Sequence, residues 1–266
     1  MNILLYIIIF IMGSLFGSFL TLATYRIPLK QNITHKRSYC PKCNHKLSFL
    51  DMFPIISYIF LKGKCRYCKS KIGSRYFIIE ILSGIAFVIL AVLLNINIYN
   101  IRIEQIAEFG FGVLYIVFLF LIAGIDKERH KINKGVLIYG IAISISYMLY
   151  QFASAEFNTN RFIIYLVIVA IILLLSIYQM QKKGKDEYEL SILIVCIIMC
   201  FFTYEVATIF SIIITILIIG IKIIVNKILN KGKKYKINIE NQPIAFYLCI
   251  ANCLTVLFAY TLYLLY

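Results

Sequence analysis

The sequence predicts an all-α protein, a polytopic membrane helix bundle of about eight spans that carries a small cytosolic module with four cysteines. Of its 266 residues, 62% are hydrophobic and only 15% are charged, whereas the surface of a water-soluble domain needs more charge. The charges are clustered, and the apolar stretches between them are about 17 to 22 residues long, enough to cross ~30 Å of hydrocarbon. Helices are expected because backbone polar groups cannot stay unpaired in lipid.

Eight apolar stretches are the predicted spans, in chain order 3–24, 76–95, 109–125, 135–152, 161–179, 189–203, 206–226 and 244–264. The first has no basic residue before its apolar run and no small-residue cleavage site, so it is interpreted as a retained helix rather than a secretory signal. The sixth is short and is separated from the seventh by Glu205, which favours a tight hairpin of the two.

The distribution of Lys and Arg predicts the orientation. With the N- and C-termini outside, the inward segments are 25–75, 126–134, 180–188 and 227–243, and together with Lys222 they hold 25 of the 27 basic residues. This asymmetry follows the positive-inside rule. The net charge of +15 is therefore mainly a topology signal: it predicts contact with membrane lipid and no nucleic-acid partner. No oligomeric state follows from it.

The chain divides into a first transmembrane helix (1–25), a cytosolic module (26–75) and a transmembrane core (76–266). The module contains two C-x2-C pairs about 20 residues apart, a spacing typical of a zinc ribbon. The ligands are Cys40, Cys43, Cys65 and Cys68. A closed shell of four thiolates leaves no open position, so a zinc ion there is expected to be structural. Two disulfides are the alternative, which the reducing cytosol disfavours.

Acidic residues at the membrane boundary are the candidates for catalysis. Asp126 ends the third span and Asp186 precedes the sixth, both on the predicted cytosolic side. Two carboxyl groups brought together share a proton, so that one can activate water while the other polarises a peptide carbonyl. The spacing alone leaves a second interpretation open, in which both are solvated charges beside Lys and Arg. Glu80, about one turn inside the second span, is a third candidate or a partner of Arg75.

An ordered series of motifs runs along the first 80 residues. It consists of Gly13-Ser14, Gly17-Ser18-Phe19-Leu20, Tyr25-Arg26-Ile27-Pro28, Arg37-Ser38-Tyr39-Cys40-Pro41-Lys42-Cys43, Leu47, Asp51, Pro54, Ser57-Tyr58, Gly63-Lys64-Cys65-Arg66-Tyr67-Cys68, Ile72, Ser74-Arg75-Tyr76 and Glu80. In this series the chain resembles the type IV prepilin peptidase family. Further along, Ile125-Asp126, Asp186 and Pro243-Ile244-Ala245-Phe246 continue the resemblance. The family's second motif reads Gly-x-Gly-Asp with Lys two residues later; here it reads Lys183-Gly184-Lys185-Asp186-Glu187-Tyr188.

The resemblance implies a bifunctional enzyme of the bacterial inner membrane. Such an enzyme would cleave the basic leader of prepilin or pseudopilin chains at the cytosolic face, using Asp126 and Asp186 as a GxGD-type aspartate pair. It would then methylate the new N-terminus with S-adenosylmethionine, with Glu80, Ser83 and Gly84 as the residues expected at the cofactor. The altered second motif supports an alternative, a non-catalytic zinc-module membrane protein that binds pilin-like chains or assembly components.

Overall fold

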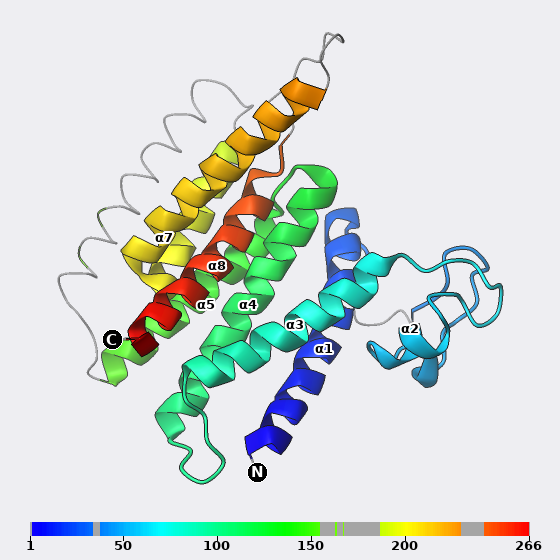
Figure 1. Cartoon of the computed structure of the whole chain (residues 1–266), viewed down its shortest axis with the longest axis horizontal. Coiled ribbons are helices and arrows are strands. Elements are labelled where there is room, and N and C mark those ends of the chain that lie inside the picture. The colour runs from blue at the N-terminus through cyan, green and yellow to red at the C-terminus, as the bar shows by residue number, and fades with distance from the viewer. Residues whose placement is uncertain are drawn as a thin grey trace. The chain divides into compact units, whose positions relative to one another are not determined.

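The computed structural model describes residues 2–33, 38–154, 187–229 and 242–265, together with Ile163 and Val167. These residues form helices and no named strand, which confirms the all-α prediction. The helices are α1 (Asn2–Arg26), α2 (Ile56–Phe60), α3 (Ser74–Leu93), α4 (Ile103–Arg129), α5 (Lys134–Ala153), α7 (Glu187–Leu229) and α8 (Ile244–Leu265), with 3-10 turns at Ile27–Leu29 and Phe49–Asp51 (Figure 1).

Five helical segments in the described part of the chain are long and apolar enough to cross a membrane. They are Asn2–Leu29, Ser74–Leu93, Ile103–Arg129, Lys134–Ala153 and Val206–Val225, and two shorter apolar helices cover Tyr188–Thr203 and Ile244–Leu257. These segments correspond to seven of the eight predicted spans. The other, 161–179, lies outside the described residues except for Ile163 and Val167. Several apolar helices of this kind fit a multi-pass membrane protein.

The chain forms two compact units, Met1–Val117 and Phe118–Tyr266. In the first, α1 packs closely along α3 because both helices present small residues at the contact. A Cβ atom placed on Gly13 would lie 2.7 Å from the backbone oxygen of Ser83, and one on Gly17 would lie 2.9 Å from the Cα of Glu80. Small residues allow such close approach between membrane helices, where packing rather than water exclusion drives association.

Gly17→Ala should therefore weaken the α1–α3 contact, by about 1–3 kcal/mol, the usual cost of overpacking a close contact. The added methyl group meets backbone atoms of α3, which cannot rotate away. Gly110→Ala is the matched control, because a Cβ at Gly110 meets nothing within 4 Å. Thermal unfolding of the two variants in the same detergent measures the difference. Equal melting temperatures for both variants would show that the close approach at Gly17 carries no stability.

In the second unit, α7 must fold back on itself. Tyr188, near its start, accepts a hydrogen bond from the backbone nitrogen of Ile244 at 3.1 Å. Lys222, near its end, donates to the hydroxyl of Tyr247 at 2.8 Å. A straight helix would separate Tyr188 from Lys222 by about 51 Å, whereas Ile244 and Tyr247 are less than one turn apart on α8. The chain therefore reverses direction between Tyr188 and Lys222, as the predicted hairpin of the sixth and seventh spans requires.

The returning parts of α7 are joined to α8 by a buried polar network. The amide of Asn252 donates to the hydroxyls of Thr203 at 3.1 Å and Ser211 at 3.3 Å, and Ser211 in turn pairs with Thr255 at 2.9 Å. Asn252 and Ser211 are fully buried. Hydrogen bonds of this kind hold helices together in lipid. The network therefore fixes the register of α7 on α8 and, with it, the position of the start of α8.

Candidate functional site

The four predicted metal ligands come together in the module. The sulfur atoms of Cys40, Cys43, Cys65 and Cys68 all lie within 4.8 Å of one another. The Cys40 and Cys68 sulfurs are 3.8 Å apart, and a tetrahedral site with metal–sulfur bonds of ~2.3 Å places its sulfurs about 3.8 Å apart. The donor set and its spacing therefore fit a metal ion.

Each cysteine pair sits on a turn with the same backbone pattern. In the first turn the Asn44 nitrogen donates to the Cys40 oxygen at 2.8 Å, and the Cys40 nitrogen donates to the His45 oxygen at 3.0 Å. In the second turn the Lys69 nitrogen makes the corresponding bond to Cys65 at 3.0 Å. Asn44 and Lys69, each directly after a second cysteine, have φ of 56° and 58°. The two turns therefore bring their four thiols together at one point.

The electrostatics of the cluster favour a bound cation. The backbone N–H of Cys43 is the largest influence that lowers the pKa of Cys40, to about 6, and the Ser70 hydroxyl lowers the pKa of Cys68. A hydrogen bond from His45 acts to lower the pKa of Cys43, yet burial and the neighbouring Cys68 and Cys40 thiols raise it to about 11. Negative charge is thus stabilised on part of the cluster and disfavoured on the rest, and a metal ion relieves that repulsion.

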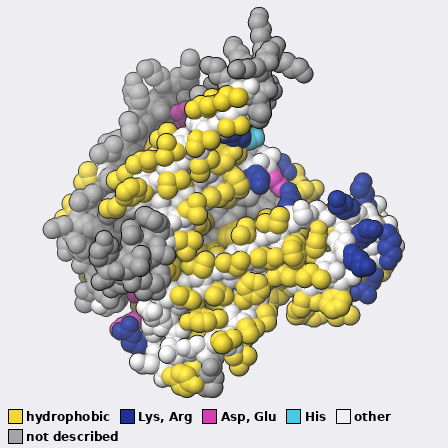
Figure 2. Space-filling view, in the orientation of Figure 1, with side chains coloured by type: hydrophobic (Ala, Val, Ile, Leu, Met, Phe, Trp, Pro, Cys, Tyr) yellow, Lys and Arg dark blue, Asp and Glu magenta, His cyan; other side chains and the backbone are white. Residues whose placement is uncertain are grey.

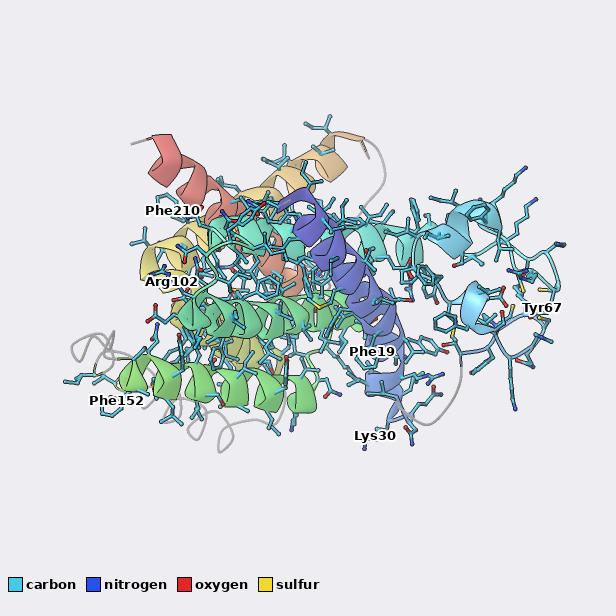
Figure 3. All side chains as sticks on the ribbon, turned by 90° about the horizontal axis from the view of Figure 1, so that it is seen from below. Phe19, Lys30, Tyr67, Arg102, Phe152 and Phe210 are labelled. Atoms are coloured by element: carbon cyan, nitrogen blue, oxygen red, sulfur yellow. The ribbon has the colours of Figure 1, made fainter. Side chains whose placement is uncertain are left out.

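Asp51 links the two halves of the module. Its carboxylate accepts hydrogen bonds from the backbone nitrogen and hydroxyl of Ser48, from Arg66 at 2.6 Å and from Tyr67 at 3.2 Å. Burial acts to raise the pKa of Asp51, but the Ser48 and Arg66 hydrogen bonds outweigh it and hold the pKa below its usual value. The Tyr67 ring also packs against the His45 ring in a tilted arrangement, with centroids 3.6 Å apart, and Tyr67 lies at the end of the module remote from α3 (Figure 3). One ionised carboxylate therefore ties the first part of the module to the second cysteine turn.

The residues expected at the methyl-transfer cofactor lie on α3 where it meets the module and α1. Glu80 is 8% exposed, and its carboxylate accepts a hydrogen bond from the Ile55 nitrogen at 2.8 Å. Ser83 is fully buried, and a Cβ on Gly84 would lie 2.7 Å from the Ser14 hydroxyl. The side chain of Glu80 thus meets the module, whereas Ser83 and Gly84 are occupied in packing against α1.

Asp126 lies at the end of α4 and is fully buried. One carboxylate oxygen accepts a hydrogen bond from the Tyr188 hydroxyl at 2.6 Å, and the other accepts from the backbone nitrogen of Phe246 at 2.9 Å. Three helices, α4, α7 and α8, therefore meet at this one carboxylate. The other predicted catalytic residue, Asp186, lies outside the described residues.

Two contributors to this site were missed in the sequence. The first is Tyr188, whose hydroxyl donates to Asp126 and accepts from the Ile244 nitrogen. The second is the start of α8, which directly follows Pro243. The first backbone N–H groups of a helix have no acceptor within that helix, and proline is common at this position. These N–H groups carry partial positive charge, which suits a carboxylate. The available signals were the place of Tyr188 two residues after Asp186, and the proline.

Comparison with known proteins matches residues 11–94 to the bacterial peptidase A24 N-terminal domain. The chain is 42% identical over 85 residues to the prepilin leader peptidase/N-methyltransferase of Vibrio cholerae, covering 29% of this chain and 34% of the relative. It is 38% identical over 81 residues to the protein of that name from Myxococcus xanthus, covering 30% and 24%. It is 32% identical over 132 residues to that from Bacillus subtilis, covering 50% of each.

These similarities confirm the resemblance to prepilin peptidases found in the sequence. The region matched to the family begins within the first span, at residue 11, and contains the cysteine module and Glu80. The aligned part of the chain spans half or less of the length of these three relatives. No solved structure matches the chain.

Proposed function

Starting from a chain whose N-terminal part is similar to prepilin peptidases, we propose a membrane aspartic endopeptidase that removes the basic leader of prepilin or pseudopilin chains. A second activity, methylation of the new N-terminus, forms part of the proposal. The observation that carries the peptidase activity is Asp126, a fully buried carboxylate at the end of a membrane helix, which accepts hydrogen bonds from one donor on α7 and one on α8. A buried acid of this kind within a membrane segment is by default a functional group.

The proposed partner of Asp126 is Asp186. It stands two residues before Tyr188 in the sequence, and the Tyr188 hydroxyl donates to Asp126, which supports pairing these two acids. Two carboxyl groups brought together share a proton. The ionised one accepts a proton from the attacking water, and the protonated one donates to the oxygen of the peptide carbonyl.

The proposed location is the bacterial cytoplasmic membrane, with the module and the Asp126 end of α4 on the cytosolic side. The basic residues support this orientation, because Arg102 and Arg161 alone fall in the outward segments. The positive-inside rule also keeps a basic prepilin leader in the cytosol, so the leader and the proposed catalytic residues would lie on the same side of the membrane.

We propose zinc as the ion in the four-cysteine site. Four thiolates at tetrahedral spacing are typical of structural zinc, and no ligand position is left for water or substrate. Ser70 supports the ligands by pairing with the Cys68 sulfur at 3.0 Å. The role assigned to the ion is to stabilise a module with a small core.

For methyl transfer, S-adenosylmethionine would be bound near Glu80, with Ser83 and Gly84 behind it. Glu80 supplies a carboxylate at the junction of the module and α3, suited to orienting an amine or a cationic cofactor. Ser83 and Gly84 pack α1 against the same stretch of α3 and so position Glu80 relative to α1. When bound, the cofactor supplies an electrophilic methyl group.

The test is to incubate the protein, embedded in lipid, with a leader-bearing pilin and to weigh the products. The expected products are the free leader and a mature chain that carries one methyl group when S-adenosylmethionine is present. Intact pilin that co-purifies with the protein without cleavage would instead support the non-catalytic alternative.

Tyr188→Phe should lower kcat for leader cleavage about 10- to 100-fold, the effect of one hydrogen bond to a charged group. The KM for the pilin should stay unchanged, because the lost hydroxyl contacts Asp126 and the Ile244 nitrogen rather than a surface group. Tyr99→Phe is the control, since Tyr99 is 70% exposed in a loop. A kcat equal to that of wild type would show that Asp126 works without this donor.

A further inference from the structure

The cysteine module exposes an unusual number of large apolar side chains on one short segment. Between Phe49 and Phe60, six are exposed by 37–82%: Phe49, Leu50, Met52, Ile56, Ile59 and Phe60. The run from Met52 to Leu61 contains no charged residue. Exposed apolar side chains gathered in this way usually mark a surface that something else covers.

Two contacts hold this segment beside the first two turns of α3. The Ile55 nitrogen donates to the Glu80 carboxylate at 2.8 Å, and the Tyr58 ring stacks on Phe77 with centroids 4.9 Å apart. Phe77 and Glu80 are three and six residues after the start of α3, which corresponds to about 4.5 and 9 Å along the helix axis. Because α3 has the length and apolarity of a membrane span, the segment lies at the depth where that span enters the membrane.

Specific hydrogen bonds support the conformation that presents the apolar side chains. Ile55 has φ 62° and ψ −54°, and the Ile56 nitrogen donates to the Pro54 oxygen at 2.5 Å, which is a γ-turn. A positive φ is costly for a β-branched residue and persists only where its surroundings hold it. Here the Glu80 carboxylate holds the Ile55 nitrogen, and Asp51 caps the turn at Phe49.

The module as a whole is strongly basic. Described residues 38–73 contain one acidic residue, Asp51, against seven basic ones, namely Lys42, Lys46, Lys62, Lys64, Arg66, Lys69 and Lys71. Figure 2 shows dark-blue Lys and Arg side chains at the outer edge of the module and yellow hydrophobic side chains beside them. An apolar face next to Lys and Arg is the pattern of an element that lies in the membrane interface and pairs with anionic headgroups.

We propose that Phe49–Phe60 is a membrane-interfacial element, which we call the interfacial segment. Its apolar side chains, foremost Phe49, Leu50, Ile59 and Phe60, are buried in the leaflet that surrounds the start of α3. The occupant of this surface is lipid rather than a protein partner, because the segment lies at the membrane entry of α3 and its flanks carry the charge that attracts anionic lipid. The metal-binding turns are thereby docked on the membrane surface.

The chain contains no tryptophan, so a single introduced tryptophan reports on one position. Phe60→Trp replaces the most exposed apolar side chain of the segment, at 82%, with a ring of similar character. Tyr39→Trp, an aromatic exchange at a half-exposed site outside the segment, is the matched control. Each full-length variant is placed in vesicles of phosphatidylcholine and phosphatidylglycerol, with or without brominated acyl chains, after its metal content is shown to equal that of wild type.

The fluorescence of the Phe60→Trp protein should be quenched several-fold more by brominated lipid than that of the Tyr39→Trp protein, and less by aqueous acrylamide. Quenching of the Phe60→Trp protein by acrylamide with no effect of brominated lipid would overturn the proposal, because the segment would then face water. Protection from both quenchers would also overturn it and would indicate cover by protein. The measurement does not depend on enzymatic activity, so it stands apart from the proposed function.

Discussion

Asp126→Asn and Asp186→Asn should each lower the rate of leader cleavage by about 10²–10⁴-fold, the usual contribution of a general acid or base. Water attack needs one ionised and one protonated carboxyl group, and either substitution removes that pairing. The fold should survive the change at Asp126, because the amide oxygen of Asn can still accept the hydrogen bond from the Phe246 nitrogen. The rate is measured with a leader-bearing pilin and protein in lipid.

Two neighbouring acids are the controls for this result. Glu128→Gln, on an exposed site two residues after Asp126, and Glu189→Gln, exposed near the start of α7, should leave cleavage unchanged. Methylation of a pilin supplied already cleaved should survive both Asp variants, because methyl transfer to an amine needs no shared proton. An Asp186→Asn protein that cleaves at the wild-type rate would exclude Asp186 as the second acid, and Glu187 or Glu189 would then be the candidates.

Cys40→Ser should reduce the bound metal from about one ion per chain to nearly none, because a tetrahedral site that loses one of four thiolates loses most of its affinity. The module should unfold with it, since its two turns are joined mainly through the sulfur cluster and Asp51. Metal analysis of protein purified without chelator measures the loss. Limited proteolysis, with cleavage sites located in 38–73, measures the unfolding.

Cys253→Ser is the matched control, because Cys253 is a free cysteine on α8, outside the module. It should keep both the metal and the resistance to protease. Wild-type protein without metal would contradict the zinc proposal. A Cys40→Ser protein that keeps its metal would contradict the ligand assignment.

The sequence by itself determined the features that depend on local pattern. Apolar length sets where a helix can cross lipid, and so seven predicted spans appear as apolar helices in the described residues. The spacing of Cys40, Cys43, Cys65 and Cys68 was enough to predict that these cysteines form one cluster that could hold a metal ion, because a C-x2-C turn fixes its own geometry. The boundaries were less secure. The predicted span begins at 109, whereas the helix that contains it begins at Ile103, where the Gln105 side chain accepts a hydrogen bond from the Arg102 nitrogen.

Only the tertiary structure decided what surrounds the site residues. Tyr188 is 62 residues from Asp126 and Phe246 is 120 residues away, and no local pattern in the sequence connects them. In the same way, no local pattern connects Ser83 with Gly13 on α1, or the Ile55 nitrogen with Glu80. Local composition determines that a stretch is helical and apolar, whereas the partner of a buried polar group depends on which helices pack together. Those contacts follow from the close approach of α1 to α3 and from the return of α7 along α8.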